Sequence, residues 1–151
     1  MSVERPSAVL FVCTFNRVRS PMAAGLVRWL YGGEVRAESC GLAPGEEVDP
    51  LAAAVMAEIG VDLSAHLPQR LENLIDEGGF DLIVALSADA WAHVAASTSG
   101  AATSHWPTPD PTECDVSREM RLEAYRLTRR ALEARIIDRF GPSRHVVARG
   151  A

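Results

Sequence analysis

Two spacings of apolar residues alternate along the chain. Short continuous apolar runs are typical of strands buried on both faces of a parallel sheet, and apolar residues that recur every three or four positions indicate helices. The runs predict strands at residues 8–12, 35–40, 82–86 and 103–106. The helical spacing predicts helices at residues 20–31, 50–59, 70–77, from 89 onward, and 117–139. This order predicts βα units around a parallel sheet, and hence an α/β fold.

Capping residues and breakers set the predicted ends of these helices. Ser20 and Asp49 each precede a proline, so we expect both side chains to cap the free N–H groups at a helix start. Glycines follow both helices and are expected to end them. Three prolines within residues 107–111 exclude a helix there and predict a stiff loop.

The same spacing predicts which helix faces are buried. The buried face of the first helix is predicted to contain Ala23, Leu26, Val27 and Leu30. The helix that starts near residue 89 is predicted to bury Trp91, Val94 and Ala95. The last helix is predicted to bury a stripe formed by Met120, Ala124, Leu127, Ala131 and Ala134. The tail after Gly141 is expected to fray.

Length and composition are those of one globular domain spanning residues 1–151. No apolar run approaches the roughly 20 residues that cross a bilayer, and no signal-peptide pattern is present, so no membrane partner is expected. The net charge of −5 argues against a nucleic-acid partner. Three cysteines without Cys-x-x-Cys spacing predict neither a disulfide framework nor a zinc site, and they fit a reducing cytoplasm.

The segment from Cys13 to Ser20 carries the candidate chemistry. It lies between a predicted strand and a predicted helix, where ligands bind in open α/β sheets. Free N–H groups and the positive helix end favour an anion, and Arg19 can hold two phosphate oxygens at once. The same features favour the thiolate of Cys13, which suits in-line attack on phosphorus. Taken alone, a cysteine that ends a buried strand is usually a small core side chain.

The other residues of this segment are predicted to support the anion site. We expect Asn16 to brace the loop, Ser20 to donate its hydroxyl to the thiolate, and Arg17 to reach solvent or the mouth of the cleft. The predicted phosphate-binding segment also includes Thr14, Phe15 and Val18.

Asp110 is the second candidate catalytic residue. Cleavage of a phosphate ester needs a proton on the leaving oxygen, which a carboxylic acid can supply, and the resulting carboxylate can then activate water. Asp110 lies in the proline-rich loop after the last predicted strand, so we expect it at the same edge of the sheet. An Asp-Pro pair is also typical of a simple turn, and that interpretation stays open.

Together these segments resemble the low-molecular-weight protein tyrosine phosphatases and the arsenate reductases that share their fold. The resemblance covers residues 9–140 and depends on motifs in this order: Cys13-x5-Arg19-Ser20-Pro21-Met22-Ala23, Ser39-Cys40-Gly41, Asp49-Pro50, residues 60–66, and Trp106-Pro107-Thr108-Pro109-Asp110-Pro111. It implies a three-layer α/β/α fold with a four-stranded parallel sheet flanked by helices. It also implies Cys13 as the nucleophile that forms a phosphocysteine, Arg19 as the transition-state clamp, and Asp110 as acid and then base. No metal and no organic cofactor are implied.

The implied substrate is a phosphorylated protein or a small phosphate ester whose phosphate binds in the loop. Phe15 stands where the family commonly has glycine, and its ring is expected to wall the pocket. Val18 stands where a second cysteine often protects the nucleophile. Thr112-Glu113 replace the aromatic residues that often follow the Asp-Pro pair in tyrosine-directed relatives, which weakens the case for phosphotyrosine more than the case for phosphatase chemistry.

Two alternative functions are compatible with this sequence. An arsenate reductase would use the same loop, but residues 87–100 contain no cysteine to pass electrons on, so it would depend on an external thiol. A non-catalytic oxyanion-binding regulatory module would have lost an essential group, whereas Cys13, Arg19 and Asp110 are all present.

Four further residues are interpreted as structural. We expect Cys40 to be buried at a strand end and Cys114 to be an exposed loop thiol. His66 is expected to lie near the loop in a structural role, and Trp106 is expected in the core.

Overall fold

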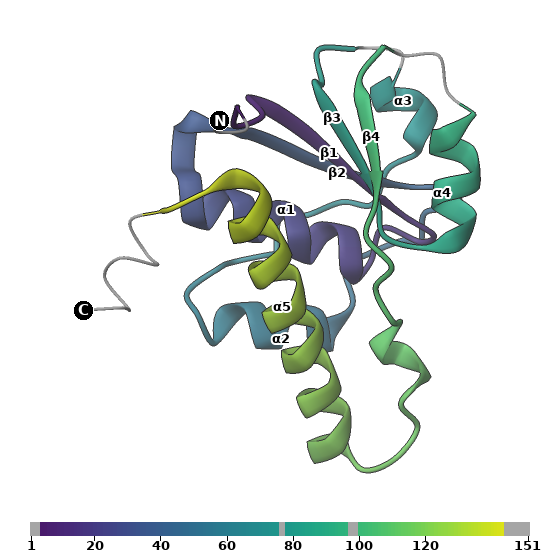
Figure 1. Cartoon of the computed structure of the whole chain (residues 1–151). Coiled ribbons are helices and arrows are strands. Elements are labelled where there is room, and N and C mark those ends of the chain that lie inside the picture. Colours follow the sequence, from purple (N-terminus) through teal and green to yellow (C-terminus); the bar gives the residue numbers. More distant parts are fainter. Residues whose placement is uncertain (1–3, 76–77, 97–99, 144–151) are drawn as a thin grey trace.

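The computed structural model describes residues 4–75, 78–96 and 100–143. At its centre is a four-stranded sheet in the order β2-β1-β3-β4, in which every neighbouring pair of strands is parallel (Figure 1). The strands are β1 (Ala8–Cys13), β2 (Arg36–Gly41), β3 (Leu82–Ala85) and β4 (Ala102–His105). The four-stranded parallel sheet expected from the sequence is confirmed.

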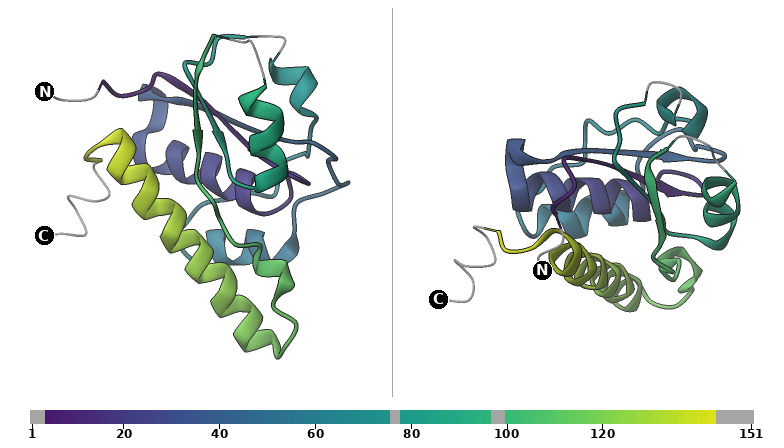
Figure 2. Two further views of the ribbon diagram at one scale, coloured as in Figure 1. Left: turned by 45° about the vertical axis from the view of Figure 1, so that its right-hand side comes forward. Right: turned by 45° about the horizontal axis from the view of Figure 1, so that its top comes forward.

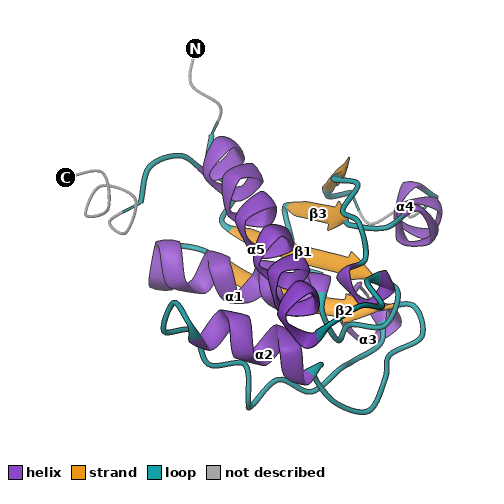
Figure 3. Cartoon of the chain, turned by 90° about the horizontal axis from the view of Figure 1, so that it is seen from below, coloured by secondary structure: helices purple, strands orange, loops and turns teal. Residues whose placement is uncertain are grey.

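Helices cover both faces of this sheet. They are α1 (Arg19–Tyr31), α2 (Pro50–Ala57), α3 (Leu71–Ile75), α4 (Ala88–Ala95) and α5 (Arg118–Phe140), with short 3-10 turns η1 (Gly32–Glu34) and η2 (Pro111–Glu113). Helices α1, α2 and α5 lie together on one side of the sheet, and α3 and α4 lie on the other (Figures 2 and 3). The expected three-layer α/β/α arrangement is therefore also confirmed.

Side-chain alternation along β1 divides the core into two parts. Val9, Phe11 and Cys13 pack on the side of α1, α2 and α5, whereas Leu10 and Val12 pack with α3 and α4. All six residues of β1 are buried, as expected for an inner strand covered on both faces. Cys13 therefore ends an inner strand with its side chain on the α1 side of the sheet.

The start of α1 differs from the sequence expectation. Its N-cap residue is Val18, and no side chain caps it, so the prediction of a Ser20 cap is wrong. Ser20 lies fully buried in the first turn, where its hydroxyl contacts Cys13 instead. The matching prediction for α2 is confirmed, because the Asp49 carboxylate accepts hydrogen bonds from two N–H groups of the first turn. The uncapped N-terminus of α1 keeps N–H groups available for a ligand.

The buried face of α1 is as predicted, but the predicted stripe of α5 is wrong. Met120 and Leu127 are each 58% exposed. The face of α5 that packs inward is formed by Tyr125, Thr128, Arg129, Leu132, Ile136 and Phe140. Both stripes have helical spacing, so spacing alone does not choose between them. The observed one carries the larger apolar side chains and removes more apolar area from water.

The two helices on the other face also differ in detail from expectation. In α4, Val94 is buried, but Trp91 is partly buried and Ala95 is exposed, because the buried face runs through Ala90 and Val94. The predicted end of the helix at residues 76–77 and the predicted frayed tail from residue 144 lie outside the described residues. Within the described ranges, no helix combines the length and apolar character that crossing a membrane requires.

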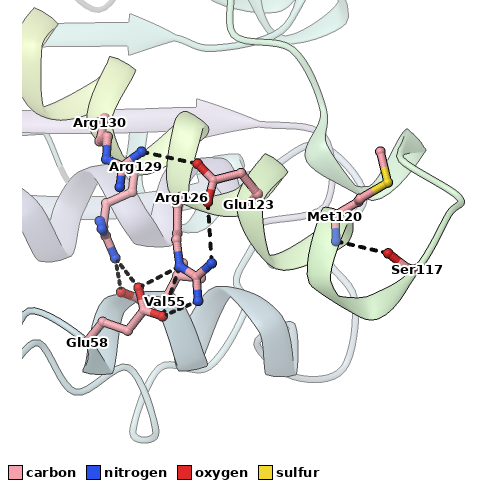
Figure 4. A network of polar contacts seen from close by, with 8 residues as sticks. All are labelled: Val55, Glu58, Ser117, Met120, Glu123, Arg126, Arg129 and Arg130. Carbon is pink, nitrogen blue, oxygen red and sulfur yellow. Dashed lines mark hydrogen bonds and ion pairs between the residues drawn. The ribbon is translucent and has the colours of Figure 1, made fainter.

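A charged network joins α2 to α5 (Figure 4). The carboxylate of Glu58, just after α2, accepts hydrogen bonds at 2.8 Å from Arg126 and from Arg129. Arg129 is buried and also donates to the carbonyl of Val55. The hydrogen bond from Arg126, followed by that from Arg129, lowers the pKa of Glu58 to about 2. The network fixes the relative position of two helices whose residues reach the site described below.

Replacing Glu58→Gln should lower the free energy of unfolding by about 1–3 kcal/mol at neutral pH, because the buried guanidinium of Arg129 loses its anion. The folded-state pKa of Glu58 is lowered, so its carboxylate stabilises the fold above pH 4.5 and this contribution disappears as the pH falls towards 2. Urea denaturation at neutral and acidic pH measures both effects.

The matched control is Glu123→Gln, since Glu123 pairs with the partly exposed Arg126 and the exposed Arg130 and has no buried partner among its ion pairs. It should cost less than about 1 kcal/mol. An equal loss for Glu58→Gln at both pH values would contradict the assigned role.

Candidate active site

A pocket of about 250 Å³ lies beside the loop that joins β1 to α1, at the carboxyl edge of the sheet. The loop residues that line it are Cys13, Phe15, Arg17, Val18 and Arg19. Distant segments contribute Asp49, Asp110, Thr112, Arg121 and Tyr125. Of the site residues predicted from the sequence, all line this one pocket except Thr14, Asn16 and Ser20.

The backbone of the loop turns its carbonyl groups away from the pocket. All six carbonyls from Cys13 to Val18 accept hydrogen bonds of 2.9–3.2 Å from groups outside the loop. The donors are the backbone N–H groups of Met22, Leu42, Ala43, Gly45 and Asp49, and the imidazole of His66. Among the hydrogen bonds between described residues, none uses a backbone N–H of residues 14–18 as donor. A loop with bound carbonyls and unused N–H groups is suited to an anion.

Asn16 fixes the turn at the centre of the loop. Its φ of 53° lies in the left-handed region, which asparagine tolerates better than most residues. Its side-chain nitrogen donates to the hydroxyls of Ser20 at 2.8 Å and Ser39 at 2.9 Å, and its oxygen accepts from the N–H of Gln69 at 2.9 Å. Phe15 has no positive φ, so its position does not require glycine.

His66 supports the same turn from outside the loop. Its Nε2 lies 2.9 Å from the carbonyl oxygen of Asn16. A carbonyl only accepts, so Nε2 carries the hydrogen and donates it. Burial lowers the pKa of His66, which keeps the imidazole neutral at neutral pH. The sequence had indicated a structural role for this histidine near the loop, and its position agrees with that interpretation.

The Cys13 sulfur lies at the floor of the pocket, where the residue is only 2% exposed. Its Sγ is 2.8 Å from the Oγ of Ser20. That oxygen already accepts a hydrogen bond from Asn16, so the Ser20 hydrogen is free to point at the sulfur, and the Cys40 carbonyl at 3.3 Å is a more distant acceptor. A hydroxyl that donates to the sulfur stabilises a thiolate.

Arg19 and Asp110 meet at this pocket from opposite ends of the sequence. Nη1 of Arg19 donates to the carbonyl of Thr108 at 2.9 Å, which ties the cysteine loop to the proline-rich loop. One carboxylate oxygen of Asp110 accepts hydrogen bonds from both the N–H and the hydroxyl of Thr112. The Asp-Pro pair thus does form a turn, capping η2, and the same residue lines the pocket.

Besides Thr112, which lies two positions after Asp110, the sequence did not indicate three further pocket residues as site residues. Tyr125 and Arg121 come from α5, and Asp49 was recognised only as a helix cap. The Tyr125 hydroxyl donates to the second carboxylate oxygen of Asp49 at 3.2 Å, and burial, together with the Asp49 charge, raises the pKa of Tyr125. No local motif marks these residues, because only the packing of α5 against α2 brings them to the loop.

The remaining sequence expectations concern residues around the pocket. Thr14 donates its hydroxyl to Asp89 at 2.8 Å, away from the pocket lining. Trp106 is in the core beside Phe11, as expected. Cys40 is fully buried, as expected, and burial raises the pKa of its thiol. Cys114 is partly buried rather than exposed.

Replacing Gly41→Ala should distort the cysteine loop. A Cβ at this position would lie 2.8 Å from the carbonyl oxygen of Thr14 and 2.9 Å from the N of Asn16, in a loop held by the Thr14 carbonyl and by the Asn16 side chain. We expect a loss of about 1–3 kcal/mol in unfolding free energy and weaker phosphate binding, measured by urea denaturation and calorimetry.

The matched control for Gly41 is Gly33→Ala, where an added Cβ meets nothing within 4 Å. Its stability should change by less than about 0.5 kcal/mol. Unchanged phosphate binding in Gly41→Ala would show that the loop does not depend on this close backbone approach.

The fold has three layers, with a parallel sheet between two layers of helices, and a cysteine loop follows an inner strand at its carboxyl end. This arrangement defines a class of α/β proteins with an anion site. The chain belongs to the low molecular weight phosphotyrosine protein phosphatase family, whose model matches residues 8–140.

Similar proteins include arsenate reductases and a protein whose structure was solved with a phosphonate. Arsenate reductase 1 of Staphylococcus epidermidis is 32% identical over 76% of this chain and 85% of its own length. A glutaredoxin arsenate reductase of Synechocystis sp. is 37% identical over 52% of this chain, and that match spans only 58% of the relative. The structure of Vibrio vulnificus Wzb in complex with benzylphosphonate has a TM-score of 0.67 and 26% identity, covering 87% of this chain and 98% of that one.

Side-chain clusters that could bind a metal ion were also sought in the structure. Among the described residues, no group of three or more histidine, cysteine, aspartate or glutamate side chains is placed to hold a metal ion.

Proposed function

We propose that this protein hydrolyses phosphate monoesters through a phosphocysteine intermediate. The observation that carries the proposal is a pocket lined by Cys13, Arg19 and Asp110, beside a loop in which the backbone N–H groups of residues 14–18 have no hydrogen-bond acceptor among the described residues. Each group supplies one requirement of phosphoryl transfer, namely a nucleophile, an oxyanion cradle and a proton donor.

In the first step the Cys13 thiolate attacks phosphorus, and the bond between phosphorus and the leaving oxygen breaks. Asp110, in its protonated form, gives its proton to that oxygen, so the product leaves as an alcohol or phenol. The loop N–H groups and the planar fork of Arg19 bind the three equatorial oxygens, on which the charge of the transition state is spread. Ser20 releases its hydrogen bond to the sulfur as the new bond forms.

In the second step water attacks the phosphorus of the phosphocysteine. The Asp110 carboxylate takes a proton from this water, the bond between sulfur and phosphorus breaks, and inorganic phosphate and the Cys13 thiolate are regenerated. The same aspartate therefore acts as acid and then as base, and the protein is unchanged after one turnover.

An aryl phosphate, including protein phosphotyrosine, is the substrate class that the pocket walls support best. The Phe15 ring lines the pocket and is 53% exposed, so it offers a free aromatic face beside the sulfur. The related Wzb protein was solved with benzylphosphonate, which combines an aromatic ring with an oxyanion. Phe15 compensates for the aromatic residues missing at Thr112 and Glu113.

Arsenate reduction is the second candidate, and the names of the relatives at 32–37% identity favour it. Such a reaction needs a thiol to take over from Cys13. Cys40 is paired with Val12 across the sheet, so its side chain lies on the opposite face from Cys13. Since a disulfide demands close Cβ atoms that face each other, Cys40 cannot serve without backbone rearrangement. Cys114 is partly buried and lies outside the pocket lining, so the reaction would depend on an external thiol.

One side-by-side experiment separates the two candidates. Hydrolysis of p-nitrophenyl phosphate and thiol-coupled reduction of arsenate are measured on the same preparation, without added metal. Ester hydrolysis in excess supports the phosphatase, and arsenate turnover without ester hydrolysis would replace it with the reductase.

Replacing Cys13→Ser should abolish turnover of p-nitrophenyl phosphate while phosphate binding persists, because the loop N–H groups and Arg19 remain. Rates and calorimetric phosphate titration measure the two properties. The matched control is Cys114→Ser, which changes a cysteine outside the pocket lining and should keep the wild-type rate. Wild-type turnover in Cys13→Ser would falsify the mechanism.

Replacing Asp110→Asn should slow turnover by about 10²–10⁴-fold, the usual contribution of a general acid. Asparagine keeps the side-chain oxygen that accepts from Thr112, so the turn is preserved and the loss reports proton transfer. Rates with p-nitrophenyl phosphate and with a poorer leaving group check this, since the poorer leaving group should suffer more. Normal rates with both would remove the acid assignment and leave the nucleophile untouched.

A further inference from the structure

Two arginine side chains at the pocket have no part in the reaction described above. Arg17 reaches the pocket from the cysteine loop and Arg121 from the first turns of α5. Within the described part of the chain, neither side chain has a carboxylate within ion-pair distance. In a protein of net charge −5, two unpaired cations beside the nucleophile indicate an anionic ligand.

Arg17 is held in place before any ligand arrives. Its Nε donates to the carbonyl of Glu47 at 2.8 Å, and its stem packs so closely on Gly45 that an added Cβ there would lie 2.4 Å from the arginine Cδ. These contacts leave the two terminal nitrogens of the guanidinium for a ligand. An arginine fixed in this way loses little side-chain entropy when it binds a carboxylate.

Arg121 differs from the three arginines in the middle of α5, at positions 126, 129 and 130. Arg126, Arg129 and Arg130 all pair with Glu58 or Glu123 (Figure 4). Arg121 lies close enough to Tyr125 to influence its titration, but it has no such carboxylate partner among the described residues.

The two acids of the pocket form no ion pair with Arg17 or Arg121 among the described residues. One oxygen of Asp49 accepts from the N-terminus of α2 and the other from the Tyr125 hydroxyl, and Asp110 accepts from Thr112. Three arginines and two aspartates line the pocket, so its lining favours a further anion on the substrate.

We infer that Arg17 and Arg121 select a phosphoester whose leaving group carries a second negative charge, specifically an acidic peptide segment around a phosphorylated residue. The inference depends on the proposed function. A peptide fits better than a small ester because exposed apolar side chains flank both arginines: Phe15 beside Arg17, and Met120 next to Arg121. An acidic peptide with apolar neighbours matches both the charge and the apolar surface.

The test compares two phosphotyrosyl peptides that differ only in flanking Glu or Gln residues, with p-nitrophenyl phosphate as a third substrate. The wild-type enzyme should show a kcat/KM about tenfold or more higher for the Glu peptide, the usual effect of a hydrogen bond between charged groups. The difference should lie in KM, because the flanking charge is bound equally in ground and transition states. It should shrink at high salt.

The decisive readout is the ratio of the two peptide efficiencies in variants. Arg17→Gln and Arg121→Gln should each reduce this ratio, and the double variant should bring it close to one. The matched control is Arg118→Gln, an exposed arginine of the same helix outside the pocket lining, which should keep the wild-type ratio.

The possible failures are distinguishable. If the wild-type protein hydrolyses p-nitrophenyl phosphate but treats both peptides equally, or if the double variant keeps the wild-type ratio, the inference is overturned and the proposed function stands. If neither the peptides nor p-nitrophenyl phosphate is hydrolysed, the proposed function itself is wrong.

Discussion

The site depends on six consecutive carbonyl groups, those of residues 13–18, each of which accepts a hydrogen bond from a group outside the loop. A chain that turns sharply between a strand and a helix has carbonyl and N–H groups competing to face the same space. Here segments from β2 to α2, together with the first turn of α1 and His66, take every carbonyl from Cys13 to Val18. The N–H groups of residues 14–18 have no acceptor among the described residues, so they remain available to an anion.

The buried polar contacts around Asn16 make this arrangement rigid. Asn16 joins three separate segments, because its partners Ser20, Ser39 and Gln69 come from α1, β2 and the loop before α3. If one of these bonds were broken, a polar atom of the Asn16 side chain would be left unpaired in the core, which would destabilise the folded protein. The same cluster holds the Ser20 hydroxyl against the sulfur, which connects the rigidity of the loop to the state of the nucleophile.

Local sequence patterns predicted the fold well where each pattern was compatible with only one structure. The buried run before Cys13 and the spacing of Ala23, Leu26, Val27 and Leu30 each match the structure. The predicted Ser20 cap was wrong because a serine before a proline is typical of a helix cap. Nothing in the local sequence shows that its hydroxyl contacts the sulfur of Cys13 instead. The stripe of α5 was misassigned because two faces share one period.

The same limits explain which parts of the pocket were found. Cys13 and Arg19 stand in one short motif, and Asp110 follows a strand, so the edge of the sheet predicts their meeting. Tyr125 and Arg121 reach the pocket because α5 packs against α1 and α2, where the network around Glu58 also holds it. Contacts between helices distant in sequence leave no local trace, so no pattern within α5 could have indicated them.

The hydrogen bond from Arg19 to the Thr108 carbonyl has a consequence for how the site works over time. Many phosphoryl-transfer enzymes carry the proton donor on a lid that swings shut over the substrate, and its movement can limit turnover. Asp110, the donor in the proposed mechanism, lies in a loop held by prolines, by its own cap and by the hydrogen bond from Arg19 to Thr108. Under that mechanism the acid and the arginine are connected before substrate arrives, so we expect substrate to bind without a gating motion.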